Sequence, residues 1–94
     1  TQRQEEEKQV EKILERDMAE IFQELPEDKK QLFKTKGEET TKKIVDLLDK
    51  GKAKAKDVMK LIIEWLKVIP GVNKFFVEQE AKIKTDEIIK SINK

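Results

Sequence analysis

The chain of 94 residues contains no histidine, no cysteine and no tyrosine, and Ser91 is its single serine. Without cysteine there is no disulfide bond and no thiolate metal site. Without histidine there is no imidazole zinc site, no proton switch near neutral pH and no His-dependent nucleophile. Most side chains that soluble enzymes use for catalysis are therefore missing, so we expect a non-enzymatic protein without a cofactor. The lack of cysteine also favours a reducing compartment, the cytoplasm.

Long apolar runs and glycine-rich loops are missing as well. The most apolar stretch, residues 58–69, holds nine apolar residues in twelve, well short of the ~20 that a transmembrane helix needs. No membrane span is expected, but peripheral membrane contact stays possible. The chain opens at Thr1 and not at Met, which is compatible with a signal or anchor that has been removed. The three glycines stand alone, so there is no phosphate-binding loop, and Glu80 and Glu87 match no calcium loop.

Charged residues make up 44% of the chain and apolar residues only 36%, which fits a single domain with a small core. The net charge is +1, but it is unevenly distributed. Residues 1–49 carry 14 acidic and 10 basic side chains (net −4), and residues 50–94 carry 6 and 11 (net +5). Two copies could therefore attract each other head to tail. With only two arginines, sequence-specific recognition of nucleic acid is not expected.

Helical periodicity dominates the sequence and predicts an all-α fold, a small antiparallel four-helix bundle formed by residues 1–94. The first helix is expected over residues 3–24, where apolar side chains recur at three-four spacing. Residues 1–9 contain no apolar side chain and are expected to fray or project. The four Phe residues and Trp65 all occupy apolar positions of the expected helices, which favours core packing over base stacking.

A second helix is expected over residues 26–50, because Pro26 and the two acids after it suit a first helical turn. If this helix is continuous, the apolar residues on both sides of Gly37 lie on one face of it. Gly37 then marks the close approach of another helix. The alternative is two short helices that meet at Gly37.

The third and fourth helices are expected over residues 53–69 and 73–92. Gly51 follows cations that suit the end of a helix, and Asn73 is a natural N-cap. The third helix is apolar over more than half of its circumference, which predicts a central position in the core.

The fourth helix has two apolar faces that point in nearly opposite directions. One face carries Val72, Phe75, Phe76 and Ile83, and the other carries Val77, Ala81, Ile88, Ile89 and Ile92. Either the helix kinks near Thr85, or its C-terminal half packs on something outside the bundle. The second alternative predicts a partner-binding patch at Ile88, Ile89 and Ile92, since a monomer rarely leaves such a patch open.

Asp17 is a further candidate, because it lies inside the apolar arc of the first expected helix. It could fix the register of a helix–helix contact, as a polar residue does in a coiled-coil core. Equally, it could lie at the edge of the arc and pair with a neighbouring lysine.

A lysine-rich face on the third expected helix is the basis of a second hypothesis. Lys52, Lys56, Lys60 and Lys67 share one side of it, opposite the apolar arc. Such a face can bind an anionic membrane surface or nucleic-acid phosphate, or it can simply be solvated. The sequence thus favours a helical protein–protein interaction or adaptor module that binds another helix or itself, and the alternative is an electrostatic binder of anionic surfaces.

Overall fold

The computed structural model describes residues 2–92 and, for Ile92, only the backbone. This part of the chain contains five helices and no strand: α1 Gln2–Glu15, α2 Ala19–Glu24, α3 Glu27–Asp49, α4 Ala55–Leu66 and α5 Lys74–Ile92. The predicted all-α class is confirmed. Five helices form instead of four because the first expected helix is divided into α1 and α2.

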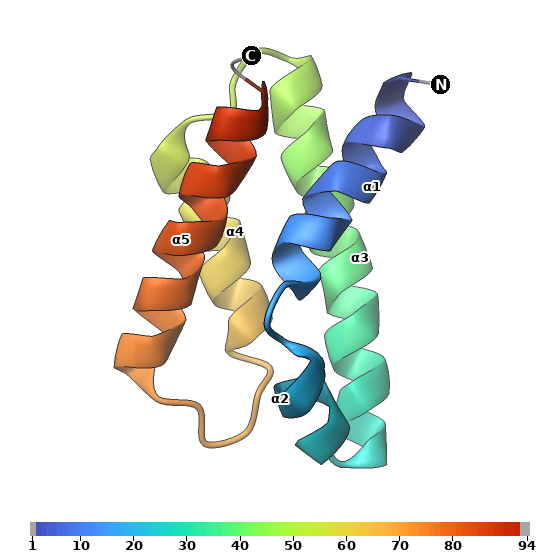
Figure 1. Cartoon of the computed structure of the whole chain (residues 1–94), viewed down its shortest axis with the longest axis vertical. Coiled ribbons are helices and arrows are strands. Elements are labelled where there is room, and N and C mark those ends of the chain that lie inside the picture. Colours follow the sequence, from blue (N-terminus) through green and yellow to red (C-terminus); the bar gives the residue numbers. More distant parts are fainter. Residues whose placement is uncertain (1, 93–94) are drawn as a thin grey trace.

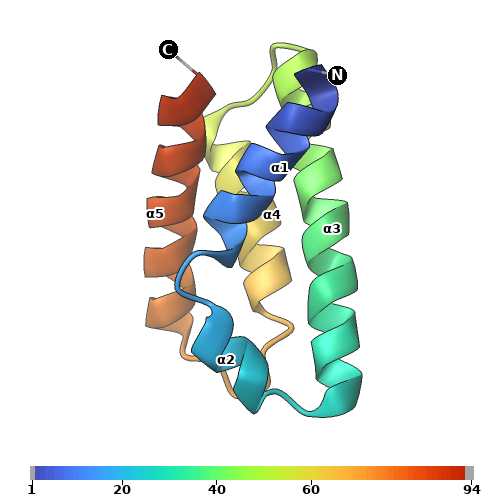
Figure 2. The ribbon, with the colours of Figure 1, turned by 45° about the vertical axis from the view of Figure 1, so that its right-hand side comes forward.

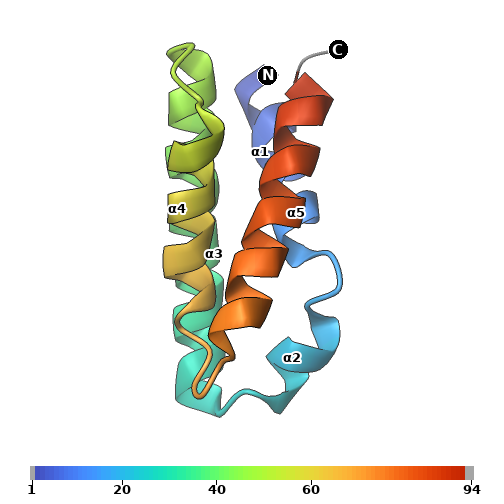
Figure 3. The ribbon, with the colours of Figure 1, turned by 90° about the vertical axis from the view of Figure 1, so that its left-hand side faces the viewer.

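Four of the helices form the body of the bundle, and the short α2 lies across one end of it (Figure 1). Contacts run from α1 to α3, from α3 to α4, from α4 to α5 and from α5 back to α1. The chain direction reverses at each of these contacts, so the predicted antiparallel packing is confirmed (Figures 1 and 3). Seen from another side, α1 lies in front of α4 and between α3 and α5 (Figure 2).

The core draws apolar side chains from all four long helices. Its most deeply buried members are Leu14, Ile44, Val45, Val58, Ile62, Leu66, Ala81 and Ile88. The short α2 contributes no buried side chain and covers the end of the core with half-buried Ile21 and Phe22. Burial of this apolar surface is the main favourable contribution to folding.

The expected single helix over residues 3–24 is wrong, because α1 ends at Glu15. Asp17 adopts a left-handed conformation with φ of 62°, at the place after a helix end where Gly or Asn is usual. Lys84 of α5 donates to carbonyls at the break: its Nζ lies 2.9 Å from the Arg16 carbonyl oxygen and 3.3 Å from that of Ile13, which also accepts from the N–H of Arg16. A cation at the C-terminal end of a helix is favourable.

The expected fraying or projection of residues 1–9 is also wrong for the residues that the structure describes. Helix α1 extends to Gln2, and Arg3 connects it to α3 by ion pairs with Asp46 at 2.7 Å and Asp49 at 2.8 Å. The periodicity of apolar residues could not reveal this contact, because the contact is purely polar. Burial, together with the nearby charge of Asp49, raises the pKa of Glu6 on the same turn of α1.

Helix α3 is continuous through Gly37, so the alternative of two short helices is wrong. The predicted close approach is confirmed, and the neighbour is Trp65 of α4. A Cβ atom at position 37 would lie 3.1 Å from the indole Nε1 atom of Trp65. Glycine is therefore required for packing here, at a cost in helix propensity of about 1 kcal/mol relative to alanine.

The predicted end of α3 and start of α5 are explained by their hydrogen bonds. After α3, the N–H of Lys52 donates to the Leu47 carbonyl and the N–H of Gly51 to the Leu48 carbonyl, which is a Schellman motif with Gly51 at φ of 67°. Before α5, the Asn73 Oδ1 atom accepts from the N–H of Phe75 at 2.7 Å. Helix α4 is shorter than expected and ends at Leu66.

Helix α5 is continuous from Lys74 to Ile92, so the kink near Thr85 is wrong. Both Lys84 and Thr85 lie buried in its middle. Of its two apolar faces, the one with Val77, Ala81 and Ile88 is turned into the core. The helix therefore leaves its other apolar face on the outside.

Candidate docking surfaces

The predicted patch at Ile88, Ile89 and Ile92 is not an exposed surface. Ile88 is completely buried in the core and Ile89 is half-buried. The Ile92 side chain lies outside the described residues. The premise of the patch is therefore wrong, because α5 packs most extensively on α4 and the face with Ile88 covers the core.

The opposite side of α5 is the exposed one. Phe75 is 71% exposed and Ile83 is 48% exposed, and Val72 and Phe76 beside them are half-buried. We call these four residues the α5 apolar face. The sequence did indicate that α5 has two apolar faces, but it did not indicate which of them the bundle would bury. The expectation that every Phe belongs to the core is wrong for Phe75.

A hollow of about 490 Å³ adjoins the α5 apolar face at the end of the bundle. Val72 and Phe76 line it from the α5 side, Ile69 from the connection between α4 and α5, and Ile21 and Leu25 from α2 and its end. Since Val72 and Phe76 belong to both, the hollow and the α5 apolar face form one continuous apolar surface.

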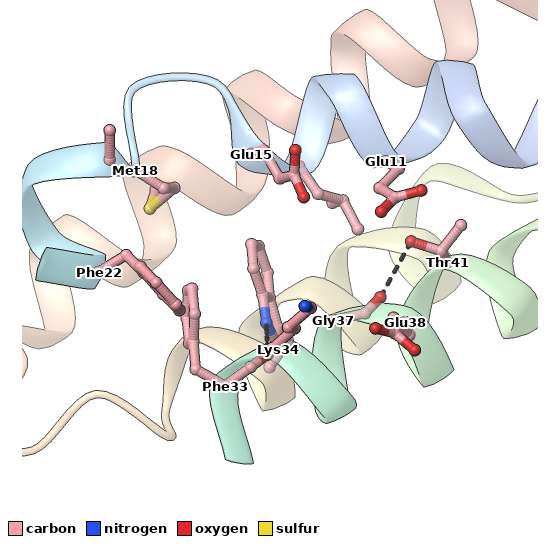
Figure 4. Close-up of a pocket in the computed structure, with 12 residues that line it drawn as sticks. Glu11, Glu15, Met18, Phe22, Phe33, Lys34, Gly37, Glu38 and Thr41 are labelled. Atoms are coloured by element: carbon pink, nitrogen blue, oxygen red, sulfur yellow. Dashed lines mark hydrogen bonds between the residues drawn. The ribbon is translucent and has the colours of Figure 1, made fainter. Parts of the chain in front are cut away.

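A second pocket, of about 410 Å³, lies between α1, α2 and α3 (Figure 4). Its floor is apolar and consists of Leu14, Met18, Phe22, Phe33 and Trp65. Figure 4 shows Met18 and Phe22 at one end of the pocket, where the chain turns from α1 into α2. Because three different helices and Trp65 of α4 contribute to the lining, no single stretch of sequence could have revealed this pocket.

The rim of this pocket is mainly acidic, and we call it the acid-rimmed pocket. Glu11 and Glu15 come from α1, and Lys34 and Glu38 come from α3 on the opposite wall (Figure 4). Three carboxylates and one ammonium give a formal net charge of −2. Within residues 2–92, none of these four side chains forms an ion pair with another residue of the chain at 4.0 Å or less.

Aromatic contacts and a hydrogen bond hold the floor of the acid-rimmed pocket in place. The rings of Phe33 and Trp65 stack with their centroids 4.6 Å apart, and Phe22 lies 6.3 Å from Phe33. The indole Nε1 of Trp65 donates to the Phe33 carbonyl at 2.9 Å. These contacts leave the floor little freedom, so the pocket is preformed.

Asp17 does not lie inside a helix–helix contact, so its expected role in fixing register is wrong. It is exposed in the turn between α1 and α2, near a cluster of charges around Lys84. In this cluster the Lys84 ammonium lies 3.5 Å from Glu80, and Arg16 pairs with Glu87 at 2.6 Å. Burial lowers the pKa of Lys84, and the charges of Glu80, Asp17 and Glu87 partly oppose that shift.

The four lysines of the predicted anionic-surface site are all exposed. Lys56 and Lys60 lie on α4, Lys67 follows its last residue, and Lys52 lies in the connection from α3. None of them forms an ion pair at 4.0 Å or less with the part of the chain that the structure describes.

Comparisons of this chain with protein-family models, with curated proteins and with solved structures give no match. No helix among residues 2–92 is long and apolar enough to cross a membrane. In the same residues, no three acidic side chains are grouped so that they could hold a metal ion.

Proposed function

We propose that this chain is a non-enzymatic interaction module that associates with a second copy of itself through the α5 apolar face. The observation that carries the proposal is the exposure of Phe75, a large aromatic side chain that packs on nothing over most of its surface. Exposed apolar surface of this kind is typical of interaction sites, and aromatic side chains dominate binding energy in protein interfaces.

The spacing of the exposed residues supports a symmetric pair of α5 helices. Phe75 lies four residues before Gln79 and Ile83 lies four residues after it, on the same side of the helix. In an antiparallel pair with its two-fold axis at Gln79, Phe75 of each copy meets Ile83 of the other. Such a self-complementary contact is the usual basis of a C2 dimer.

Charges beside the α5 apolar face are complementary in the same arrangement. Glu78 and Lys82 are exposed on one flank of this face, and neither has an ion-pair partner within residues 2–92. The two-fold axis at Gln79 brings Glu78 of each copy toward Lys82 of the other. Two ion pairs would then flank the apolar contacts and fix the register of the pair.

Sedimentation equilibrium from micromolar to millimolar concentration tests this proposal. We expect a monomer–dimer equilibrium that survives high salt, because its main contacts are apolar. Phe75→Glu should weaken association by at least about tenfold, which corresponds to roughly 1.4 kcal/mol. The matched control is Leu32→Glu, which introduces the same charge at another exposed apolar residue on α3 and should leave association unchanged.

Because the chain has no native cysteine, a single introduced cysteine can test the position of the axis. Gln79→Cys should form a disulfide-linked dimer readily under mild oxidation, and Glu64→Cys on the exposed side of α4 should not. A chain that stays monomeric up to millimolar concentration would rule the proposal out. Equal cross-linking of both variants would rule out this register.

Binding to an anionic surface is a second candidate function, favoured by the exposed and unpaired state of Lys52, Lys56, Lys60 and Lys67. We expect the chain to co-sediment with vesicles that contain phosphatidylserine, but not with neutral vesicles, and to dissociate as salt rises. Replacing all four lysines by Gln should weaken binding at least about tenfold, since each lysine near such a surface contributes about 1 kcal/mol.

The control for the lysine variant changes the net charge equally at four exposed lysines elsewhere. These are Lys8 and Lys12 on α1 and Lys42 and Lys43 on α3. If this variant loses binding to the same extent, total charge rather than the predicted face explains the attraction.

A further inference from the structure

We propose that the acid-rimmed pocket binds a small organic cation, an ammonium ion that carries an apolar chain or ring. The proposal concerns a site that is separate from the α5 apolar face. It rests on the combination of an apolar floor and an acidic rim in a single preformed pocket.

The size and lining of the pocket fit a small molecule. Its volume of about 410 Å³ falls within the range of about 300–1,000 Å³ that is usual for small-molecule sites. The apolar part of a ligand would lie on Phe22, Phe33 and Trp65, where it leaves water. The turn that carries Met18 lies at one end of the pocket, which favours a short ligand over a long segment of a partner protein (Figure 4).

The charges of the rim determine the sign of the ligand. Glu11 and Glu15 lie four residues apart and so share one side of α1, and Glu38 approaches from α3. An ammonium group at the opening would therefore lie between carboxylates on both walls. A carboxylate or phosphate at the same place would face three like charges and only Lys34 as a partner, which disfavours anions.

The rigid floor supports binding without rearrangement of the protein. Trp65 is held by its hydrogen bond to the Phe33 carbonyl and by its stacking on the Phe33 ring. A preformed site avoids the entropic cost of ordering side chains on binding. The acidic side chains of the rim are exposed and can adjust to the position of the cation.

Three probes with alkyl chains of equal length test the proposal: octylammonium, octan-1-ol and nonanoate, the last of which is the anionic probe. Trp65 is the only tryptophan and lines the pocket, so its fluorescence reports binding, and titration calorimetry gives the affinity. We expect octylammonium to bind at least about tenfold more tightly than nonanoate, with octan-1-ol between them. The advantage of the cation should shrink as salt rises. Equal binding of all three probes would overturn the proposal.

Variants then locate the site. Replacing Glu11, Glu15 and Glu38 together by Gln should remove the preference for octylammonium over nonanoate. The same replacement at three exposed glutamates outside this pocket, Glu20, Glu39 and Glu64, changes the net charge equally and should preserve the preference. If both triple variants lose it to the same extent, the preference reflects total charge and the proposal fails.

Ligand binding can be separated from self-association by repeating all titrations with the Phe75→Glu variant, in which association is expected to be weakened. Amide chemical shifts in that background should change for residues of the pocket, such as Gly37 and Thr41, and not for Ile69 and Val72 beside the hollow. Shifts confined to the hollow would overturn the assignment of the site.

Discussion

Replacing Lys84 by Met is expected to lower the free energy of unfolding at pH 7 by about 2–3 kcal/mol, the cost of removing a buried charged donor. Lys84 is only 3% exposed, and its ammonium donates to the carbonyls of Ile13 and Arg16 at the end of α1. Methionine fills similar space but donates no hydrogen bond. For a domain of this size, the midpoint of thermal unfolding should fall by roughly 10–20 °C.

Two controls separate the causes of this loss. Lys82→Met changes an exposed lysine two residues away on α5 and should have little effect. The double variant Glu80→Met, Lys84→Met leaves no carboxylate unpaired at position 80 and should recover part of the stability. It should not recover all of it, because the Arg16 carbonyl at the end of α1 still lacks the ammonium donor. Equal stability of Lys84→Met and Lys82→Met would show that water replaces the ammonium at no cost.

The same site should also make stability depend on pH. Because burial lowers the pKa of Lys84 from 10.5, there is an alkaline interval in which the unfolded chain holds this proton and the folded chain has released it. In that interval the free energy of unfolding rises with pH. Lys84→Met lacks this rise, so the difference in stability between the two proteins should widen as the pH approaches 10.5. Denaturant unfolding at a series of pH values measures it.

Lys84 also shows why the division between α1 and α2 could not be predicted from periodicity. Apolar spacing continues from Val10 through Met18 to Leu25 as if one helix contained them all. The carbonyls at the break accept hydrogen bonds from a cation that is 67 residues further along the chain than Asp17, and such a long-range polar contact leaves no local pattern. The one local hint was a charged residue among the apolar positions of the expected helix, and Asp17 lies in the turn directly after the end of α1.

The two faces of α5 show a different limit. The sequence correctly indicates that one helix cannot bury both of them, and the structure has the face of Ile88 inside and Phe75 outside. Lys84 lies on the same inner side as Ile88 and reaches the end of α1 from there. The apolar pattern of α5 did not include Lys84, because lysine is ordinarily exposed, and so the pattern gave no sign of which face the bundle would bury. Local signals were more reliable. Pro26 precedes the start of α3, Gly51 follows its end and Asn73 precedes the start of α5, as predicted.

Gly37→Ala should destabilise the protein by about 1 kcal/mol, although alanine is the better helix former by about the same amount. The added Cβ would lie 3.1 Å from Nε1 and 3.4 Å from Cε2 of Trp65. The indole cannot move away easily, because it stacks on Phe33 and donates to the Phe33 carbonyl. The cost of this overpacking, about 1–3 kcal/mol, therefore exceeds the gain in helix propensity.

The sign of the effect should reverse when the indole is removed. Trp65→Phe alone should destabilise the protein, since it leaves a cavity and removes the hydrogen bond to Phe33. In that background the Cβ added at position 37 meets no indole nitrogen, so Gly37→Ala should stabilise by up to about 1 kcal/mol. Chemical denaturation of the four proteins in this double-mutant cycle gives a coupling energy of about 2 kcal/mol if the steric argument holds. A coupling near zero would mean that Gly37 is required by the backbone of α3 and not by Trp65.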